Sequence, residues 1–125
     1  MIKRQTKYSA GADMTCSKQT TIEPNQTVLV PTDYYIDNHE YHMFYMLCAR
    51  SSISLKKNLL LMNGVGIIDS DYKDEVKVMY RNVGTEPVTL EKGERIAQII
   101  PLSYLPLFEA LDNEREGGFG SSGTT

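Results

Sequence analysis

Short apolar runs separated by turn residues are the feature of this chain that most restricts its fold. Runs rich in β-branched and aromatic residues recur from Thr20 onward, and glycine, proline, asparagine or aspartate separates each run from the next. None of them has apolar residues at the three- and four-residue spacing of an amphipathic helix. Many short strands joined by such turns are typical of a β-sandwich or barrel. The sequence therefore predicts an all-β, jelly-roll-like fold without helical segments.

The predicted strands have an apolar or alternating composition and end at turn residues. Pro31-Thr32-Asp33 and Pro101 are expected to end two of them, because proline lacks the N–H group that pairs in a sheet. Ile53 and Leu55 continue the apolar alternation and also predict extended chain. The predicted strands are 21–22, 27–30, 41–47, 59–62, 76–81, 87–90, 95–100 and 105–108.

The length of 125 residues indicates one domain, with a modest core that oligomerisation would help to complete. We assign residues 1–113 to a β-barrel domain and residues 114–125 to a C-terminal arm rich in glycine and serine. The net charge is -3, so the chain has no general attraction for nucleic acid or for acidic membranes. An anionic ligand must be bound by a few placed basic residues, which favours a small molecule over a polymer.

Nothing in the sequence predicts export or membrane insertion. Met1 to Gln5 lead into polar residues instead of an apolar signal segment, and the longest nearly apolar run, Met43 to Ala49, is too short to cross a bilayer. Cys16 and Cys48 lack the close spacing of a metal or redox pair, and we expect both to be buried, reduced thiols. These observations predict a cytoplasmic protein, or one inside the host cell if its source is a virus.

Residues 63–75 combine turn residues, strand residues and carboxylates in one short segment. Asn63-Gly64 is a strong tight-turn signal, and the apolar run that follows ends directly at Asp69. We therefore predict a β-hairpin that carries a site, with Asp69 at the end of a strand as a candidate general base. The alternative is that Asp69, Asp71 and Asp74 are only the polar cap of a hairpin, because aspartate is common in turns.

Two other segments are candidate parts of a site. Ala49-Arg50-Ser51-Ser52 brings a charge and two hydroxyl groups to the end of a predicted strand. The C-terminal arm contains Arg115, Phe119 and a run of glycine and hydroxyl residues whose backbone N–H groups could surround an anion. Composition alone favours a disordered tail, whereas an arm that orders over a phosphate-bearing ligand explains its arginine and its phenylalanine.

Taken together, five segments resemble the motifs of the trimeric dUTPase family, whose members hydrolyse dUTP to dUMP and pyrophosphate. Each segment is a weak signal alone, and the third and fifth are the most specific. Their combination, in the order of the family, spans almost the whole chain. The five segments are Ser9 to Met14, Ala49 to Ser52, Asn63 to Tyr72, Asn82 to Gly84 with Lys92 to Ile100, and Arg115 to Gly123.

The resemblance implies a homotrimer of jelly-roll-like subunits, with each active site assembled from more than one subunit. Its substrate would be dUTP, and we expect neither direct nucleic-acid binding nor a membrane partner. Asp69 would position and deprotonate the water that attacks the α-phosphorus, and Tyr72 would pack under the deoxyribose. The backbone from Asn63 to Gly66 would read the uracil edge. The implied substrate-binding residues of this third motif are Asn63, Gly64, Val65, Gly66, Ile68 and Tyr72.

The resemblance also implies a cofactor and a set of phosphate ligands. Mg²⁺ would accompany the triphosphate, and Asp13 in the first motif would hold that ion through water. The implied substrate-binding residues of the second and fourth motifs are Arg50, Ser51, Ser52 and Gln98. Those of the fifth motif are Arg115 at the phosphates, Phe119 stacked over the uracil, and Gly120, Ser121 and Ser122 at the γ-phosphate.

Two other functions compete with this one. The dCTP deaminases share the Arg50-Ser51-Ser52-Ile53 pattern, but they need a glutamate in the strand after the third motif, and Val76 to Arg81 contains no carboxylate. The other competitor is a non-catalytic nucleotide-binding protein that keeps the fold. It is disfavoured because Asp13, Asp69 and Tyr72 are all present, and a protein that only binds the nucleotide does not need the base.

Single motif residues also have structural alternatives. Arg50 could be an ordinary ion-pair partner, Gln98 a satisfied polar group on a sheet, and Tyr72 a core aromatic residue. Each alternative is the better choice if its motif is ignored, whereas the functional role is preferred within the set of five.

Overall fold

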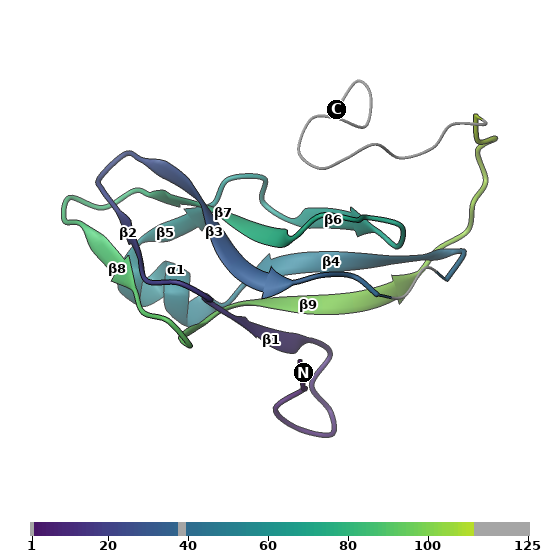
Figure 1. The fold of residues 1–125 in the computed structure, drawn as a ribbon, viewed down its shortest axis with the longest axis horizontal. Helices are drawn as coiled ribbons and strands as arrows, with labels where there is room; N and C mark the ends of the chain where they lie inside the picture. The colour runs from purple at the N-terminus through teal and green to yellow at the C-terminus, as the bar shows by residue number, and fades with distance from the viewer. Residues whose placement is uncertain (1, 38–39, 112–125) are drawn as a thin grey trace.

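The computed structural model describes residues 2–37 and 40–111, and most of the regular structure there is β-strand (Figure 1). The prediction of an all-β fold is confirmed. In chain order the elements are β1 (Ala12–Thr15), β2 (Thr20–Ile22), β3 (Thr27–Tyr34), β4 (Met43–Ala49), α1 (Ser51–Lys57), β5 (Leu59–Leu61), β6 (Gly66–Asp69), β7 (Val76–Asn82), β8 (Val88–Leu90) and β9 (Arg95–Ser103).

The strands form three antiparallel sheets around one core. Four strands pair in the order β1-β9-β4-β6, three in the order β3-β7-β5, and two as β2-β8. In Figure 1 the strands β6, β4, β9 and β1 follow one another from top to bottom. Strand β7 buries every second residue, as expected of a strand with one face on a core. The largest fully buried apolar side chains are Tyr80, Met14, Ile22, Leu59, Leu90, Ile96, Val30, Val76 and Val78.

The predicted hairpin over residues 63–75 is wrong, although its turn is present. Gly64 has a φ of 69°, and its N–H donates to the Leu61 carbonyl (2.9 Å), so the chain does turn at Asn63-Gly64. The flanking strands do not pair with each other, because β5 joins β7 whereas β6 joins β4 in another sheet. A turn signal is local and reverses the chain, while the partner of each strand depends on which layer its apolar residues can reach.

Helix α1 follows β4 where the sequence predicts extended chain, so that prediction is wrong. Ile53 is the buried residue of the helix, and Leu55 is 82% exposed. Asn58 comes next with a left-handed φ of 54°, which ends the helix. Two apolar residues two positions apart fit either a short strand or a short helix, and seven residues are too few for periodicity to separate the two.

Two prolines that were expected to end strands lie within them instead. Strand β3 continues through Pro31 by means of a bulge before Tyr34, where Asp33 has a left-handed φ of 57°. Strand β9 continues through Pro101, at a point where it still pairs with β4 but no longer with β1. Proline is tolerated where one side of a strand is unpaired.

The predicted strand over residues 105–108 is absent, and the chain there is irregular. Leu105, Leu107 and Phe108 are 78%, 79% and 92% exposed. These residues were predicted to be strand because they are apolar, but in the single chain they pair with no strand and their side chains stay exposed. Large exposed apolar side chains in such a row mark a surface that a partner can cover.

Both cysteines are free thiols, as predicted, but their burial differs. Cys16 is buried and Cys48 is only partly buried, so the burial expected for Cys48 is wrong. Within residues 2–37 and 40–111 the structure has no helix that is long and apolar enough to cross a membrane.

Asn82, at the end of β7, is fully buried and joins three segments of the chain. Its Nδ2 donates to the carbonyls of Ile22 (2.9 Å) and Glu86 (2.8 Å), and its Oδ1 accepts from the Gly84 N–H (2.9 Å). Both donors and the acceptor of the amide therefore have partners. This residue of the fourth motif has a structural role in the chain.

We expect Asn82→Ala to lower the free energy of unfolding by about 2–4 kcal/mol, because it leaves buried backbone groups without partners. Urea unfolding at one fixed protein concentration measures the change. Thr89→Ala is the matched control, since the Thr89 hydroxyl bonds the Thr21 hydroxyl at the surface (2.9 Å). We expect that variant to lose less than about 0.5 kcal/mol. Equal losses in the two variants would contradict the role assigned to Asn82.

Candidate active site

The predicted site residues fall into two groups, one around Arg50 at the end of β4 and one along β6, which runs antiparallel to β4. Arg50 follows Ala49, the last residue of β4, whereas Asp69 pairs with Phe44 near its start. The two ends are about 20 Å apart, because each strand residue advances the chain by about 3.3 Å. Arg50 and Asp69 of one chain therefore do not meet.

The first group is an arginine cluster, formed by Asp13, Arg50, Arg95 and Gln98. Gln98 of β9 lies between Asp13 of β1 and Cys48 of β4 in the sheet. Asp13 Oδ1 lies 3.4 Å from Arg50 Nε, and Asp13 Oδ2 lies 3.4 Å from Arg95 Nη1. Arg50 also donates to the Arg95 carbonyl (3.2 Å). Two positive charges around one negative charge leave an excess of positive charge, which suits an anionic ligand.

Gly11, in the first motif, leaves room for the Gln98 amide. A Cβ atom at Gly11 would lie 3.0 Å from Gln98 Oε1 and 3.0 Å from Cγ1 of Ile100. A side chain at this position would displace one of these groups. The glycine therefore lets the start of the first strand approach the fourth motif closely.

A β-bulge in β9 brings Arg95 and Gln98 to the same face of the sheet. The pairing with β1 passes from Ala97 to Arg95 and leaves Ile96 unpaired. Ile96 and Ala97 are both buried, while Arg95 is exposed and Gln98 is partly exposed. In a regular strand, residues three apart point to opposite faces. The extra residue shifts the alternation by one position, so Arg95 and Gln98 both lie on the face of the sheet that carries Asp13.

The hydroxyl of Tyr80 connects this bulge to Arg50. It donates to the Ile96 carbonyl (2.6 Å) from a fully buried position in β7. Burial raises the pKa of Tyr80 above its usual range, and the backbone N–H and the charge of Arg50 act in the opposite direction. The phenol therefore stays protonated and lies between the two segments that carry Arg50 and Arg95.

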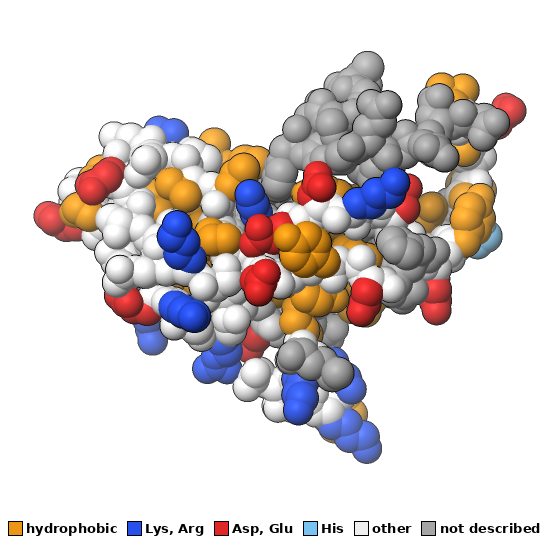
Figure 2. Space-filling model, viewed as in Figure 1, with side chains coloured by type: hydrophobic (Ala, Val, Ile, Leu, Met, Phe, Trp, Pro, Cys, Tyr) orange, Lys and Arg blue, Asp and Glu red, His pale blue; other side chains and the backbone are white. Residues whose placement is uncertain are grey.

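Ser51 and Ser52 are the first residues of α1, directly after Arg50. Ser51 is exposed and Ser52 is partly buried. Both residues therefore begin the helix at the end of β4 where the arginine cluster is found. Outside it the charges are mixed: on the face in Figure 2, Lys and Arg side chains lie in several separate places with acidic side chains between them.

The second group lies on the turn before β6 and on the strand itself. Asn63, Gly64 and Val65 are exposed. Gly66 is buried, and a Cβ atom there would lie 3.1 Å from Cβ of Leu47, so the backbone packs closely against β4. This arrangement presents the backbone of an exposed turn on a rigid sheet, which suits recognition of a flat polar edge.

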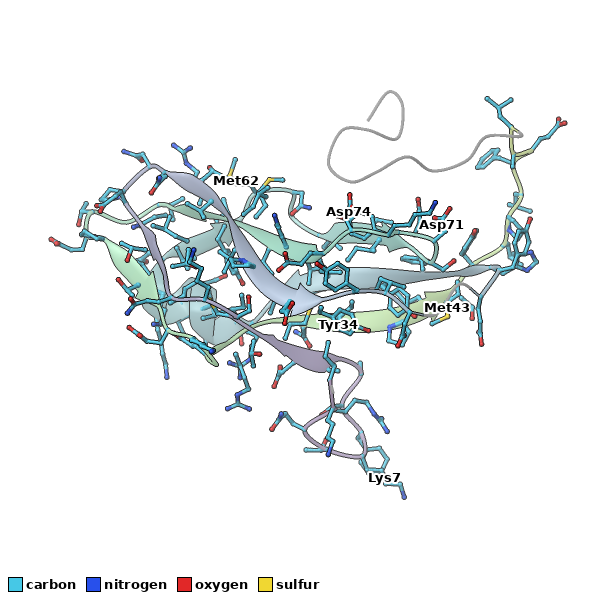
Figure 3. The ribbon with its side chains drawn as sticks, in the orientation of Figure 1. Lys7, Tyr34, Met43, Met62, Asp71 and Asp74 are labelled. Atoms are coloured by element: carbon cyan, nitrogen blue, oxygen red, sulfur yellow. The ribbon has the colours of Figure 1, made fainter. Side chains whose placement is uncertain are left out.

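Asp69 and Tyr72 lie at the other end of β6, and Ile68 beside them packs against the core. Asp69 is exposed, and its carbonyl accepts from the Tyr72 N–H (3.1 Å). The Tyr72 ring is partly buried against the core. Figure 3 shows Asp71 and Asp74 on the loop after β6, where both are exposed, which agrees with their prediction as surface groups in turns.

Some predicted residues lie outside this description, and some residues of the cluster were not predicted. Arg115, Phe119, Gly120, Ser121 and Ser122 fall outside the described residues. Arg95 and Tyr80 were missed. Arg95 stands within the fourth motif, but alternation places it on the opposite face from Gln98 unless the bulge is known. Tyr80 carries no signal beyond that of a core strand.

The described residues contain no group of three His, Cys, Asp or Glu side chains that could hold a metal ion by themselves. Asp13 is the carboxylate of the arginine cluster, and its ion pairs of 3.4 Å are longer than the 2.7–2.9 Å typical of charged hydrogen bonds. Magnesium that is bound mainly by phosphates and water needs only one or two protein carboxylates. Asp13 fits that requirement.

Comparison with known proteins agrees with this geometry. A sequence model of the dUTPase family matches residues 1–123. The deoxyuridine 5'-triphosphate nucleotidohydrolase of Desulfitobacterium hafniense is 39% identical over 131 residues, covering 96% of this chain and 85% of that protein. The crystal structure of the dUTPase from Streptococcus mutans has a TM-score of 0.82 at 32% identity, covering 87% of this chain and 89% of that one.

A third protein supports the fold. The dUTPase of Staphylococcus bacteriophage 80alpha, solved with dUPNHPP, has a TM-score of 0.78 at 24% identity over 99% of this chain and 92% of that one. The jelly-roll-like fold predicted from the sequence is therefore confirmed. Since the family model covers nearly the whole chain and the curated relative aligns along most of its length, the chain belongs to the dUTPase family.

Proposed function

We propose that the protein hydrolyses dUTP to dUMP and pyrophosphate with Mg²⁺, and so limits the uracil available for incorporation into DNA. The observation that carries this proposal is the exposed Asp69 carboxylate at the end of β6, three residues after the rigidly packed Gly66. A general base has to reach water and be held in a fixed position, and an exposed carboxylate on a paired strand suits both requirements. Family membership supplies the substrate class.

Base and sugar recognition is assigned to the second group. The backbone from Asn63 to Gly66, exposed as far as Val65, offers hydrogen-bond donors and acceptors to the uracil edge, and Ile68 supports it from the core side. The ring of Tyr72 packs under the deoxyribose, where a 2′-hydroxyl would clash with it. A steric wall of this kind rejects the larger sugar without needing a polar partner.

The reaction is a displacement at the α-phosphorus. Asp69 accepts a proton from a water molecule as the water oxygen bonds to the α-phosphorus. The bond from that phosphorus to the oxygen bridging to the β-phosphate breaks, and pyrophosphate leaves with the bonding electrons. Arg50, Ser51, Ser52 and Gln98 orient the phosphates and stabilise the negative charge that develops on them.

Two further contributions come from groups that the structure does not describe. The C-terminal arm would place Arg115 at the phosphates, Phe119 over the uracil, and Gly120, Ser121 and Ser122 at the γ-phosphate. Magnesium would neutralise part of the triphosphate charge when bound, and Asp13 would hold the ion through water. Arg50 would exchange part of its contact with Asp13 for a contact with phosphate.

We also propose a homotrimer with shared active sites. One chain keeps Asp69 about 20 Å from Arg50, so a complete site needs a second chain. The four-stranded sheet carries an apolar row on the face away from the core: Met46 pairs with Ile67 on one side and Ile100 on the other, next to Phe44 opposite Leu102. Ile67 is 61% exposed in the single chain. Such a row favours burial against another subunit.

A location inside the cell, cytoplasmic or within the host of a virus, remains part of the proposal. The free thiols of Cys16 and Cys48 suit a reducing compartment.

We expect Asp69→Asn to bind dUTP but to hydrolyse it at least about a hundredfold more slowly, because an amide cannot accept the proton. Pyrophosphate release with Mg²⁺ measures the rate, and Asp74→Asn, on the same exposed loop, should be close to wild type. Unchanged turnover in Asp69→Asn would remove this residue from the mechanism. Ammonia release from dCTP by the wild type would identify a deaminase. Binding of dUTP without release of pyrophosphate would identify a non-catalytic binding protein.

Shared sites can be tested by mixing two inactive variants. Asp69→Asn and Arg50→Ala are unfolded together in urea at equal concentration and refolded. If each site takes Asp69 from one chain and Arg50 from another, about a quarter of the sites receive both intact residues by random assembly. Each variant refolded alone is the control. Activity no greater than the sum of the two controls would show that the sites are not shared in this way.

We expect Tyr80→Phe to lower kcat/KM for dUTP about tenfold, because the bulge and Arg50 lose their common hydrogen-bonding group and misplaced charges stabilise the transition state poorly. Steady-state kinetics measures the effect, and the melting temperature shows whether the protein stays folded. Tyr34→Phe, a partly buried tyrosine of β3, is the control. A fall in melting temperature with unchanged kinetics would give Tyr80 a purely structural role.

A further inference from the structure

The loop after β6 is attached to β3 by the carboxylate of Glu75. One oxygen of this group, Oε2, accepts hydrogen bonds from the N–H groups of Thr32 (3.1 Å) and Asp33 (2.8 Å). Both N–H groups lie in the bulge of β3, where the pairing with β7 is interrupted between Pro31 and Tyr34. The carboxylate therefore takes the place of the missing sheet partner at this bulge.

The same residue holds Tyr72. The Tyr72 hydroxyl donates to the Glu75 carbonyl (3.3 Å), and the Tyr72 N–H donates to the Asp69 carbonyl (3.1 Å). The tyrosine is thus fixed at its backbone to the end of β6 and at its ring to the start of β7. Through the side chain of Glu75, this second point is joined to β3.

We propose that Glu75 is a positioning residue that fixes the Tyr72 ring and thereby sets the discrimination between deoxyribonucleoside and ribonucleoside triphosphates. The inference rests on the proposed role of Tyr72 at the deoxyribose. A steric wall excludes a hydroxyl group only if it cannot move away, because a shift of about 1 Å is enough to relieve such a clash. The rigidity of the wall comes from what holds the ring, and the ring hydroxyl donates to the Glu75 carbonyl.

A separate hydrogen bond holds β3 against β7 when Glu75 is changed. The Thr32 hydroxyl donates to the Val76 carbonyl and accepts from the Tyr34 N–H (3.2 Å). Thr32 is buried, and this contact does not involve the carboxylate. Loss of the Glu75 side chain is therefore expected to loosen the loop without separating the strands.

The test compares dUTP and UTP as substrates of Glu75→Ala, Glu75→Gln and wild type. We expect Glu75→Ala to reduce the ratio of kcat/KM for dUTP to that for UTP about tenfold, because the loosened ring tolerates the 2′-hydroxyl. Glu75→Gln should keep most of the ratio, since one amide oxygen can accept from both N–H groups. Asp74→Ala, the adjacent exposed carboxylate, is the control and should leave the ratio unchanged. Melting temperatures are recorded for every variant.

The outcomes separate this inference from the proposed role of Tyr72. Tyr72→Ala should lower the dUTP-to-UTP ratio at least as much as Glu75→Ala does. An unchanged ratio in Tyr72→Ala would refute the sugar-contacting role itself. The positioning role of Glu75 would be overturned if Tyr72→Ala changes the ratio and Glu75→Ala does not. An equal loss of kcat/KM for dUTP and UTP in Glu75→Ala counts as an unchanged ratio. If Glu75→Ala does not fold, Tyr72→Phe, which removes the ring contact with Glu75, decides by the same ratio.

Discussion

The pairing of β4 with β6 on one side and with β9 on the other decides how far Arg50 and Gln98 lie from Asp69. The register of β6 puts Asp69 opposite Phe44, while the register of β9 puts Gln98 opposite Cys48, near the other end of the same strand. A sheet is stiff along its strands, so this separation of about 20 Å is not closed by small motions. The fold itself therefore keeps Asp69 and Arg50 apart, and the same sheet exposes an apolar face that suits burial against another subunit.

The β-bulge in β9 places Arg95 and Gln98 on one face, near the end of β4 that leads to Arg50. A regular β9 would point Arg95 and Gln98 to opposite faces, and the unpaired Ile96 reverses this. The carbonyl of a bulged residue needs a new partner when it is buried, and the hydroxyl of Tyr80 supplies one. A residue deep in the core thus supports the bulge that brings Arg95 and Gln98 to one face of the sheet.

Features that depend on composition or on neighbouring residues are predicted well from the sequence. Strand content, the turn at Asn63-Gly64 and the place of Asp69 at a strand end all follow from local patterns. Strand partners do not, since the hairpin signal before β6 is compatible with pairing in either sheet. The bulge at Ile96 and the helix after Arg50 were missed for a related reason: each is decided by contacts with distant residues, namely the Tyr80 hydroxyl and the core around Ile53.

The arginine cluster gives a chain of net negative charge a local excess of positive charge, which suits a polyanion. Two guanidinium groups placed together repel each other, and in the absence of a ligand the carboxylate of Asp13 offsets that repulsion from between them. The groups are consequently held in place without a ligand, so under the proposed function little energy would be spent on bringing them together during the reaction. Because Asp13 contacts both arginines, replacing it by an uncharged residue would disturb their positions as well as any ion it holds through water. Its contribution to the site is therefore at least partly that of a positioning residue.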